Sequence, residues 1–390
     1  MSETSSIEWT DATWNPIAGC SLVSPGCTNC YAMRRVAPRL AANPATPHYH
    51  GTVQPSKAGP VWTGKIGIAS DKVLMAPIGW KKPRRIFVNS TSDLFHEGVP
   101  DEVIDRVFAV MALCPQHTFQ VLTKRPQRMR DYLAEPHRFI LVERSKQKFL
   151  PPPPAKPLKA TPFTWRDPKE IPPRRWPLPN VWLGVSVEDQ PRADDRIPVL
   201  LGTPAAVRWI SAEPMLGSID IRRYMWPVHP RWPGKYKRPA DAIAAGDEVT
   251  YHRQALVSAD ARFLDWVVCG GESGSGARPM HPDWSRSLRD QCLSAGVPFL
   301  FKQWGDWWEA ASDVRDDSGN HISVDADTSE ADDMFDAATD TLLAADGRQF
   351  APGDLPENLP ARLMTRLGKK AAGRLLDGVL HDAYPTPKGQ

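Results

Sequence analysis

The sequence predicts an α/β fold in which parallel strands alternate with crossover helices. Short apolar runs alternate with amphipathic stretches from about residue 84 onward. These runs are continuous rather than alternating, which is typical of strands covered on both faces. Each run also ends in a cluster of polar residues, as strands do where a parallel barrel or open sheet meets its active site.

Six apolar segments are expected to form the sheet, and a seventh candidate covers residues 66–73. The six are residues 86–89, 118–123, 181–187, 207–211, 263–269 and 297–301. Because parallel neighbours need a long return connection, the amphipathic stretches between them should be helices. The expected helices are residues 101–113, 127–134, 192–201 and 283–295, and Asp101 follows Pro100 as the cap of the first.

Three segments depart from this pattern. Prolines from Pro151 to Pro154 exclude a regular helix or central strand there, within a stretch (145–176) that holds eight Lys or Arg against two acids. Residues 222–262 mix basic and aromatic side chains. This mixture is typical of a surface that binds phosphates and stacks bases, but it is equally expected of a structural segment that prolines hold rigid and whose aromatic side chains pack inward. Residues 306–346 hold thirteen acids and Arg315 alone as a base.

The expected organisation follows from these departures. Residues 1–305 should form the main domain, with insertions at about 136–180 and 222–262. Residues 306–350 are expected to be a flexible acidic insertion, and residues 351–390 a helical extension.

The bulk composition restricts the class of protein. With 41% hydrophobic and 24% charged residues the chain is an ordinary globular sequence, long enough at 390 residues to bury a full core. It has no run of about 18 apolar residues to span a membrane. The amino terminus lacks an apolar signal-peptide core, so we expect a cytoplasmic protein.

Three of the six cysteines, Cys20, Cys27 and Cys30, lie within eleven residues, which suggests a metal or catalytic site rather than disulfides. Thiolates bind iron–sulfur clusters, and three cysteines leave one iron of a cubane open. The alternative is a zinc site completed by His48 or His50. The other cysteines, Cys114, Cys269 and Cys292, look like small buried hydrophobes.

Beyond the cysteines, several stretches resemble the three-Cys-motif family found in phages and bacteria. The matching stretches are Ile7–Pro16, Cys30–Ala32, Ser92–His96, Leu122–Pro126, Trp182–Glu188, Ser211–Pro214, Gly270–Gly274, Ala277–Met280, Phe301–Gly305 and Gly368–Asp377. That family is similar to divergent radical S-adenosylmethionine (SAM) enzymes, nearest in character to spore photoproduct lyase. The chain's CxxxxxxCxxC spacing departs from the CxxxCxxC that is commonest among such enzymes.

The resemblance implies a partial (β/α)6 barrel of the TIM-like radical SAM type, with the cysteine loop after the first strand. It implies two cofactors, a 4Fe–4S cluster and SAM, and an external electron donor. It also implies that Cys20, Cys27 and Cys30 ligate the cluster. The resemblance leaves room for a separately encoded partner protein.

Roles for other residues follow from their place at strand ends. The expected SAM-binding residues are Ser90, Asp93, Ser186, Glu188, Glu213, Gly270, Gly271 and Glu272. Tyr31, Lys124 and Glu272 are the expected catalytic residues, with plain core packing as the alternative for Tyr31. Lys124, Arg125 and Lys302 would bind a substrate phosphate or the SAM carboxylate, or else form internal ion pairs with strand-end glutamates.

The expected function is radical SAM chemistry on a nucleobase or nucleotide within DNA, as an isomerase of base hypermodification or as a repair enzyme. One alternative is a zinc-containing protein that binds nucleic acid or acts in phage–host conflict without radical chemistry. Another is an iron–sulfur protein that uses SAM for a non-radical transfer.

Overall fold

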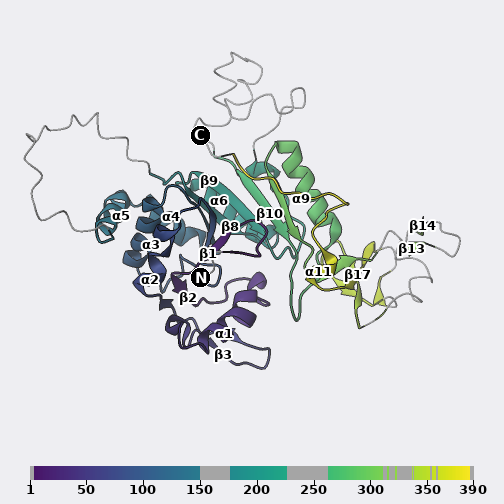
Figure 1. Cartoon of the computed structure of the whole chain (residues 1–390). Coiled ribbons are helices and arrows are strands. Elements are labelled where there is room, and N and C mark those ends of the chain that lie inside the picture. Colours follow the sequence, from purple (N-terminus) through teal and green to yellow (C-terminus); the bar gives the residue numbers. More distant parts are fainter. Residues whose placement is uncertain are drawn as a thin grey trace, which may run out of the picture.

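Seven parallel strands form the central sheet of the computed structural model, and they curve into a half-barrel (Figure 1). The strands are β1 (Ala12–Trp14), β6 (Arg85–Val88), β7 (Thr118–Thr123), β8 (Val181–Ser186), β9 (Val207–Ala212), β10 (Trp266–Gly270) and β11 (Phe299–Gln303). They lie side by side in chain order, each pairing in parallel with the next. The predicted α/β class with parallel strands is therefore confirmed.

The structure describes residues 4–149, 176–225, 262–310, 314–315, 321–322, 336, 338–351, 354–356 and 359–386. The proline-rich segment, most of the basic and aromatic segment and much of the acidic one lie outside these ranges. Within the described residues, no helix has the length and apolar character that crossing a membrane requires.

The crossover helices lie where the periodicity predicts them. They are α3 (Asp101–Leu113), α4 (Pro126–Ala134), α6 (Gln190–Gly202) and α9 (Pro282–Ala295), joined by α5 (Arg138–Gln147) in the segment expected to be an insertion. Asp189 caps the start of α6, because its side chain accepts a hydrogen bond from the backbone N–H of Arg192. α9 ends at Gly296 in the left-handed conformation (φ 64°), as glycine allows at a helix terminus.

The strands bury different residues on their two faces. Ile86 and Val88 of β6 belong to the large core beneath the helices, whereas Phe87 packs on the concave side. There Trp9, Trp182, Trp209 and Trp266 form the floor of the half-barrel, with the rings of Trp209 and Trp266 5.2 Å apart. Gly184 of β8 is required below this floor, because a Cβ there would lie 2.4 Å from the Trp209 ring.

Residues 15–70, which follow β1, form a separate lobe beside the sheet. It contains the hairpin of β3 (Val53–Gln54) and β4 (Val61–Trp62), and the π-helical turn η2 (Ala32–Val36), which continues into α1 (Ala37–Ala41). Its own small core includes Met33, Tyr49 and Trp62. The expectation of a strand at 66–73 is wrong for the main sheet: only β5 (Gly67–Ile68) forms, antiparallel to β2 (Ile17–Ala18), and α2 (Asp71–Leu74) follows.

The carboxyl-terminal part of the chain holds a second, antiparallel sheet. Its order is β12 (Trp307–Glu309), β17 (Ala361–Arg366), β15 (Asp340–Ala344) and β16 (Gln349–Phe350). The prediction of a helical extension over 351–390 is wrong, because β17 and the four-residue α11 (Lys369–Ala372) occupy its described part. In β17, Leu363 and Met364 are buried, and this burial favours a strand over the expected helix.

A pH prediction arises at the start of α9, where His281 is 2% exposed and its Nδ1 accepts a hydrogen bond from the backbone N–H of Asp283. Burial lowers the pKa of His281, so the unfolded chain takes up a proton there before the native protein does. This contribution to stability is present above about pH 6.5, the unfolded pKa, and is lost as the pH falls further. We expect His281→Asn, which keeps an acceptor without titrating, to lose less stability than wild type between about pH 7.5 and about pH 5.5. Urea denaturation of both proteins checks this, and equal losses would contradict it.

Candidate functional site

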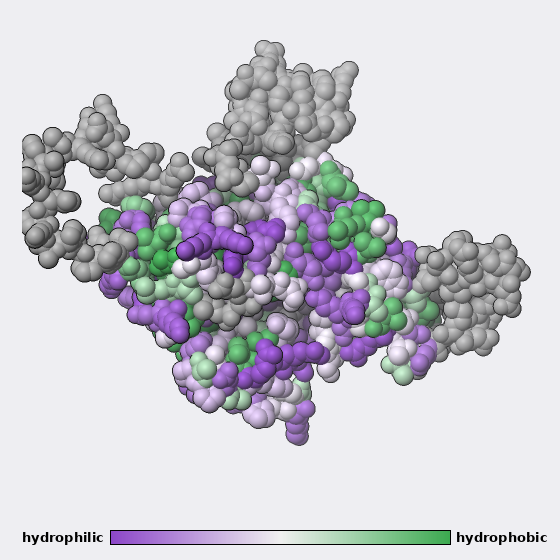
Figure 2. All heavy atoms as spheres, viewed as in Figure 1, coloured by the Kyte–Doolittle hydropathy of each residue, from purple (hydrophilic) through white to green (hydrophobic). Residues whose placement is uncertain are grey.

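A cavity of about 250 Å³ opens at the carboxyl ends of the parallel strands, above the tryptophan floor. All three clustered cysteines line it, together with side chains that follow β6, β7, β8, β9 and β10. Figure 2 shows the molecule's face in this view, which is largely hydrophilic with smaller apolar patches. Five of the six polar strand ends therefore lie at one cavity, whereas the end of β11 does not line it.

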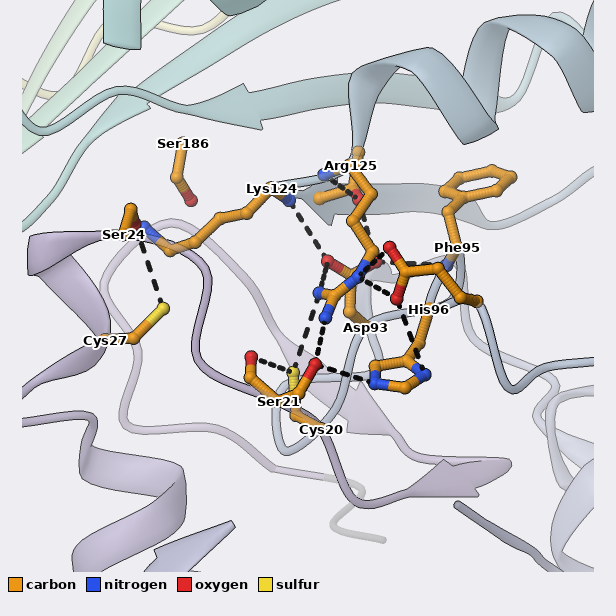
Figure 3. Close-up of polar contacts among 12 residues, drawn as sticks. Cys20, Ser21, Ser24, Cys27, Asp93, Phe95, His96, Lys124, Arg125 and Ser186 are labelled. Carbon is orange, nitrogen blue, oxygen red and sulfur yellow. Dashed lines mark hydrogen bonds and ion pairs between the residues drawn. The ribbon is translucent and has the colours of Figure 1, made fainter. Parts of the chain in front are cut away.

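Cys20 is held by a charged network from the end of β7 (Figure 3). Nη1 of Arg125 lies 3.8 Å from the Cys20 Sγ and 3.1 Å from Oδ2 of Asp93, and Nη2 donates to Ser21 Oγ at 2.7 Å. The Arg125 Nε donates to Glu97. Only 6% of Arg125 is exposed, so water screens little of the attraction between its charge and the neighbouring Asp93 and Cys20.

Cys27 is held through Ser24 and a buried carboxylate. The Ser24 Oγ lies 3.8 Å from the Cys27 Sγ (Figure 3). The same hydroxyl donates to Oε1 of Glu188. Glu188 is fully buried and forms ion pairs with Lys124 and with Nη1 of Arg196, the latter at 3.0 Å. Burial raises the pKa of Glu188, but the charges of Lys124 and Arg196 outweigh it and hold that pKa below its usual value. Glu188 is therefore an anion that anchors the loop.

Cys30 is held through its neighbour Asn29. The Asn29 Nδ2 donates to Oε2 of Glu272 at 3.0 Å and to the Gly276 carbonyl at 2.6 Å. Arg278 forms a bidentate ion pair with Glu272 and donates through Nη2 to the Pro25 carbonyl. Burial raises the pKa of Glu272, yet the hydrogen bonds from Arg278 and Asn29 leave that pKa lowered overall. The turn after β10 is therefore hydrogen-bonded to the cysteine loop.

The thiols themselves lie in surroundings that favour the neutral form. Burial raises the pKa of Cys20 to about 12, and burial also raises that of Cys30. Both are therefore protonated at neutral pH without a metal, so binding of a metal must release protons. Gly26 lets the loop approach this closely, because a Cβ there would lie 2.4 Å from the Glu188 side chain.

The structure places the predicted residues unequally. Those that line the cavity are Cys20, Cys27, Cys30, Tyr31, Ser90, Asp93, Lys124, Arg125, Ser186, Glu213, Gly271 and Glu272. Gly270 and Glu188 do not line it: Gly270 is buried within β10, and Glu188 lies behind the loop. Their expected contact with SAM stays a prediction, and in this structure other protein atoms cover both residues.

The alternative roles of the charged residues are the ones that the structure shows. Lys124 pairs with Glu188 and Lys302 with Glu213, so each lysine has a strand-end glutamate as its partner. Asp93 accepts hydrogen bonds from the side chains of Thr123 and Arg125 and from two backbone N–H groups, so it organises the strand ends. Tyr31 is 57% exposed, so plain core packing is wrong for it.

Several residues that complete the site were not predicted. The sequence analysis missed Ser24, Asn29 and Arg278, because each of them bonds to a residue more than 160 positions away and the local pattern does not indicate such a partner. Asn89 also lines the cavity, with φ at 59° and both amide atoms buried without a hydrogen-bond partner in the described structure. A polar residue at the end of an apolar run was the one available signal for Asn89.

The remaining cysteines and the histidines proposed for zinc lie apart from the cavity. Cys114, Cys269 and Cys292 are fully buried, as predicted. Neither His48 nor His50 lines the cavity. Across the part of the chain that the structure describes, no three His, Cys, Asp or Glu side chains are spaced to hold a single metal ion.

The donor set of this cavity fits an iron–sulfur cluster better than a zinc ion. It offers three thiols, and among the described residues the carboxylates that line it, those of Asp93, Glu213 and Glu272, are each held by arginine or lysine. A structural zinc ion takes four protein ligands, whereas a cubane with three leaves one iron free for another molecule.

A comparison with protein families matches residues 4–385 to the family described as "Protein of unknown function (DUF5131)". No curated protein and no solved structure matches the chain.

Proposed function

The chain belongs to the family described as "Protein of unknown function (DUF5131)", and we propose that it is a radical SAM enzyme that acts on a nucleobase or nucleotide within DNA. The reaction would be an isomerisation in base hypermodification or a repair step, with electrons from an external donor. The observation that carries the proposal is the meeting of three thiols at one cavity, at the carboxyl ends of a parallel half-barrel. The three-Cys-motif resemblance supports the same chemistry.

In this proposal Cys20, Cys27 and Cys30 hold a 4Fe–4S cluster. When bound, the cluster supplies the electron that cleaves SAM reductively and starts hydrogen abstraction from the substrate. The protein contributes a loop that is anchored before any cofactor arrives, because Arg125, Glu188 and Glu272 each anchor the part of the loop that carries one of the cysteines. Such support orients metal ligands and tunes the metal.

The cavity also offers groups to hold a polar ligand. The amide of Asn89 presents a donor and an acceptor, both buried and unpartnered, and a buried amide is expected to find partners when a ligand binds. Ser90 and Ser186 add hydroxyls at the ends of β6 and β8. Phe87 and Leu122 close the cavity toward the tryptophan floor and exclude water from that side.

Anaerobic reconstitution with iron and sulfide tests the proposal. We expect the wild type, reduced by dithionite in the presence of SAM, to bind a 4Fe–4S cluster and release 5′-deoxyadenosine. Cys27→Ala should lose both, because a thiolate ligand is missing. Cys292→Ala is the matched control, since it removes a buried thiol of α9 outside the cavity and should keep both.

Two outcomes would count against the proposal. Tight zinc without iron or sulfide would favour a zinc protein without radical chemistry. A cluster with no deoxyadenosine, even when thymine-containing oligonucleotides are supplied, would favour an iron–sulfur protein that uses SAM in another way.

A further inference from the structure

The lobe that carries the cysteine loop has no acidic residue. The 59 residues between Asp11 and Asp71 contain no Asp or Glu, but they contain Arg34, Arg35, Arg39, Lys57 and Lys65. At the chain's average of 45 acids in 390 residues, such a stretch would hold about seven. The positive charge of this lobe is therefore not balanced from within it.

The rest of the protein does not neutralise these charges either. Arg35, Arg39 and Lys57 are exposed, and among the described residues no carboxylate lies within 4 Å of their charged groups. Arg35 and Arg39 are four residues apart along η2 and α1, where two like charges on one helical face repel each other. An arrangement that costs stability in the free protein is expected to be relieved by an anion.

The cations at the cavity, by contrast, are already paired. Lys124 and Arg125 line the cavity, and each has a carboxylate partner, as do Arg278 and Lys302 nearby, so none of the four is free for a phosphate. An anionic group of a substrate would therefore meet unpaired positive charge on the lobe and not within the cavity.

The lobe reaches the rim of the cavity at two points. Arg35 lies against Gly274 in the turn that follows Glu272, where an added Cβ would meet its guanidinium at 3.4 Å. Arg34 donates to the carbonyls of Thr28 in the cysteine loop and Ala58 in the β3–β4 hairpin, which places the hairpin tip with Lys57 beside that loop. Unpaired charge thus lies close to the cysteine loop.

Apolar side chains are exposed at the same rim. Leu22, Val23 and Tyr31 of the cysteine loop are 49%, 43% and 57% exposed, and Val23 and Tyr31 line the cavity. Apolar and aromatic groups beside positive charge suit a nucleic-acid strand, whose bases stack on such side chains while its phosphates meet the cations. Figure 1 shows the lobe, in purple, below the sheet.

We propose that the acid-free lobe is the surface that binds a nucleic-acid strand, with phosphates at Arg35, Arg39 and Lys57 and one unstacked base directed past Tyr31 into the cavity. The identity of that base's reaction rests on the proposed function, but the binding itself does not. The protein therefore takes a polymer and not a free nucleotide, and the target base must leave the stack to enter.

Fluorescence anisotropy with a labelled single-stranded DNA oligonucleotide and the full-length protein tests this, from about 50 to about 200 mM salt. We expect Arg35→Gln/Arg39→Gln/Lys57→Gln to lose at least about tenfold in affinity at low salt. The slope of log K against log salt should fall by about two, since each phosphate contact on a single strand contributes about 0.7. Arg35→Lys/Arg39→Lys keeps the charges and should bind nearly as well as wild type.

The control variant is Lys72→Gln/Lys81→Gln/Lys82→Gln. It removes the same charge from exposed positions that lie outside the acid-free stretch and do not line the cavity, and it should bind like wild type. Equal losses in both triple variants would overturn the proposal, because the effect would then be one of net charge. Wild-type binding to anionic lipid vesicles but not to DNA, or equal affinity for thymidine monophosphate and the oligonucleotide, would also overturn it. A protein that binds DNA through the lobe yet yields no deoxyadenosine would sustain this inference and count against the radical SAM proposal alone.

Discussion

Replacing Glu188 with alanine is expected to destabilise the protein by about 3–5 kcal/mol, the usual result of removing one partner from a buried ion pair. Glu188 is 0% exposed and neutralises both Lys124 and Arg196, so its loss leaves two cations in a site from which water is largely excluded. It also accepts the hydrogen bond from Ser24, so the segment around Cys27 should lose its anchor. We therefore expect a lower iron content after reconstitution as well.

Urea denaturation of the metal-free protein measures the first effect, and iron analysis after reconstitution measures the second. Asp131→Ala is the control, because Asp131 and its partner Arg130 are exposed and such surface pairs contribute at most about 1 kcal/mol. If Glu188→Ala were as stable as this control, Glu188 would not be the buried anchor that its contacts indicate. Normal iron content in a destabilised variant would separate the stability of the fold from the support of Cys27.

Replacing Arg125 with glutamine is expected to make the bound cluster harder to reduce. The guanidinium lies 3.8 Å from the Cys20 sulfur, and a positive charge with N–H donors at a ligating sulfur favours the reduced, more negative cluster. We expect the ratio of reduced to oxidised cluster at a given potential to fall about tenfold, which corresponds to about 59 mV for one electron. The expectation rests on the proposed cluster.

An EPR-monitored redox titration of the reconstituted proteins gives this potential directly, independently of turnover. Lys302→Gln is the control. It removes a cation that pairs with Glu213 near the same cavity but, within the described structure, forms no hydrogen bond to a cysteine sulfur, so it should leave the potential unchanged. Arg125→Lys should give an intermediate value, since an ammonium group lacks the fork that spans Cys20, Ser21 and Asp93. An unchanged potential in Arg125→Gln would limit Arg125 to holding Asp93 and Glu97 in place.

Local pattern was sufficient for most of the helices and strands. The apolar face of residues 101–113 predicts α3 with both of its ends correct, because one buried stripe of helical period has few other solutions. β1 escaped prediction because three residues, Ala12–Trp14, are too few to show a period. The strand β17 was missed because burial of Leu363 and Met364 against the second sheet overrides a local preference for helix.

The candidate site divides in the same way. Spacing alone brought out Cys20, Cys27 and Cys30, and the polar strand ends pointed to Lys124, Arg125 and Glu272. The acid-free stretch from residue 12 to residue 70 is likewise written in the sequence. These features are local, since each depends on residue type and position along one segment.

Only the tertiary structure decided which charges are paired and which are free. Lys124 meets Glu188 across 64 residues, and Asn29 meets Glu272 across 243, because β7, β8 and β10 bring their carboxyl ends to one edge of the sheet. A carboxylate at a strand end can bind a ligand or a neighbouring cationic side chain, and the sequence does not indicate which of the two it binds. The tertiary structure decides this, because a charged side chain can be buried only where an opposite charge lies within reach, and otherwise it stays at the surface. Glu188 and Glu272 have such partners, whereas Arg35, Arg39 and Lys57 stay exposed on the lobe.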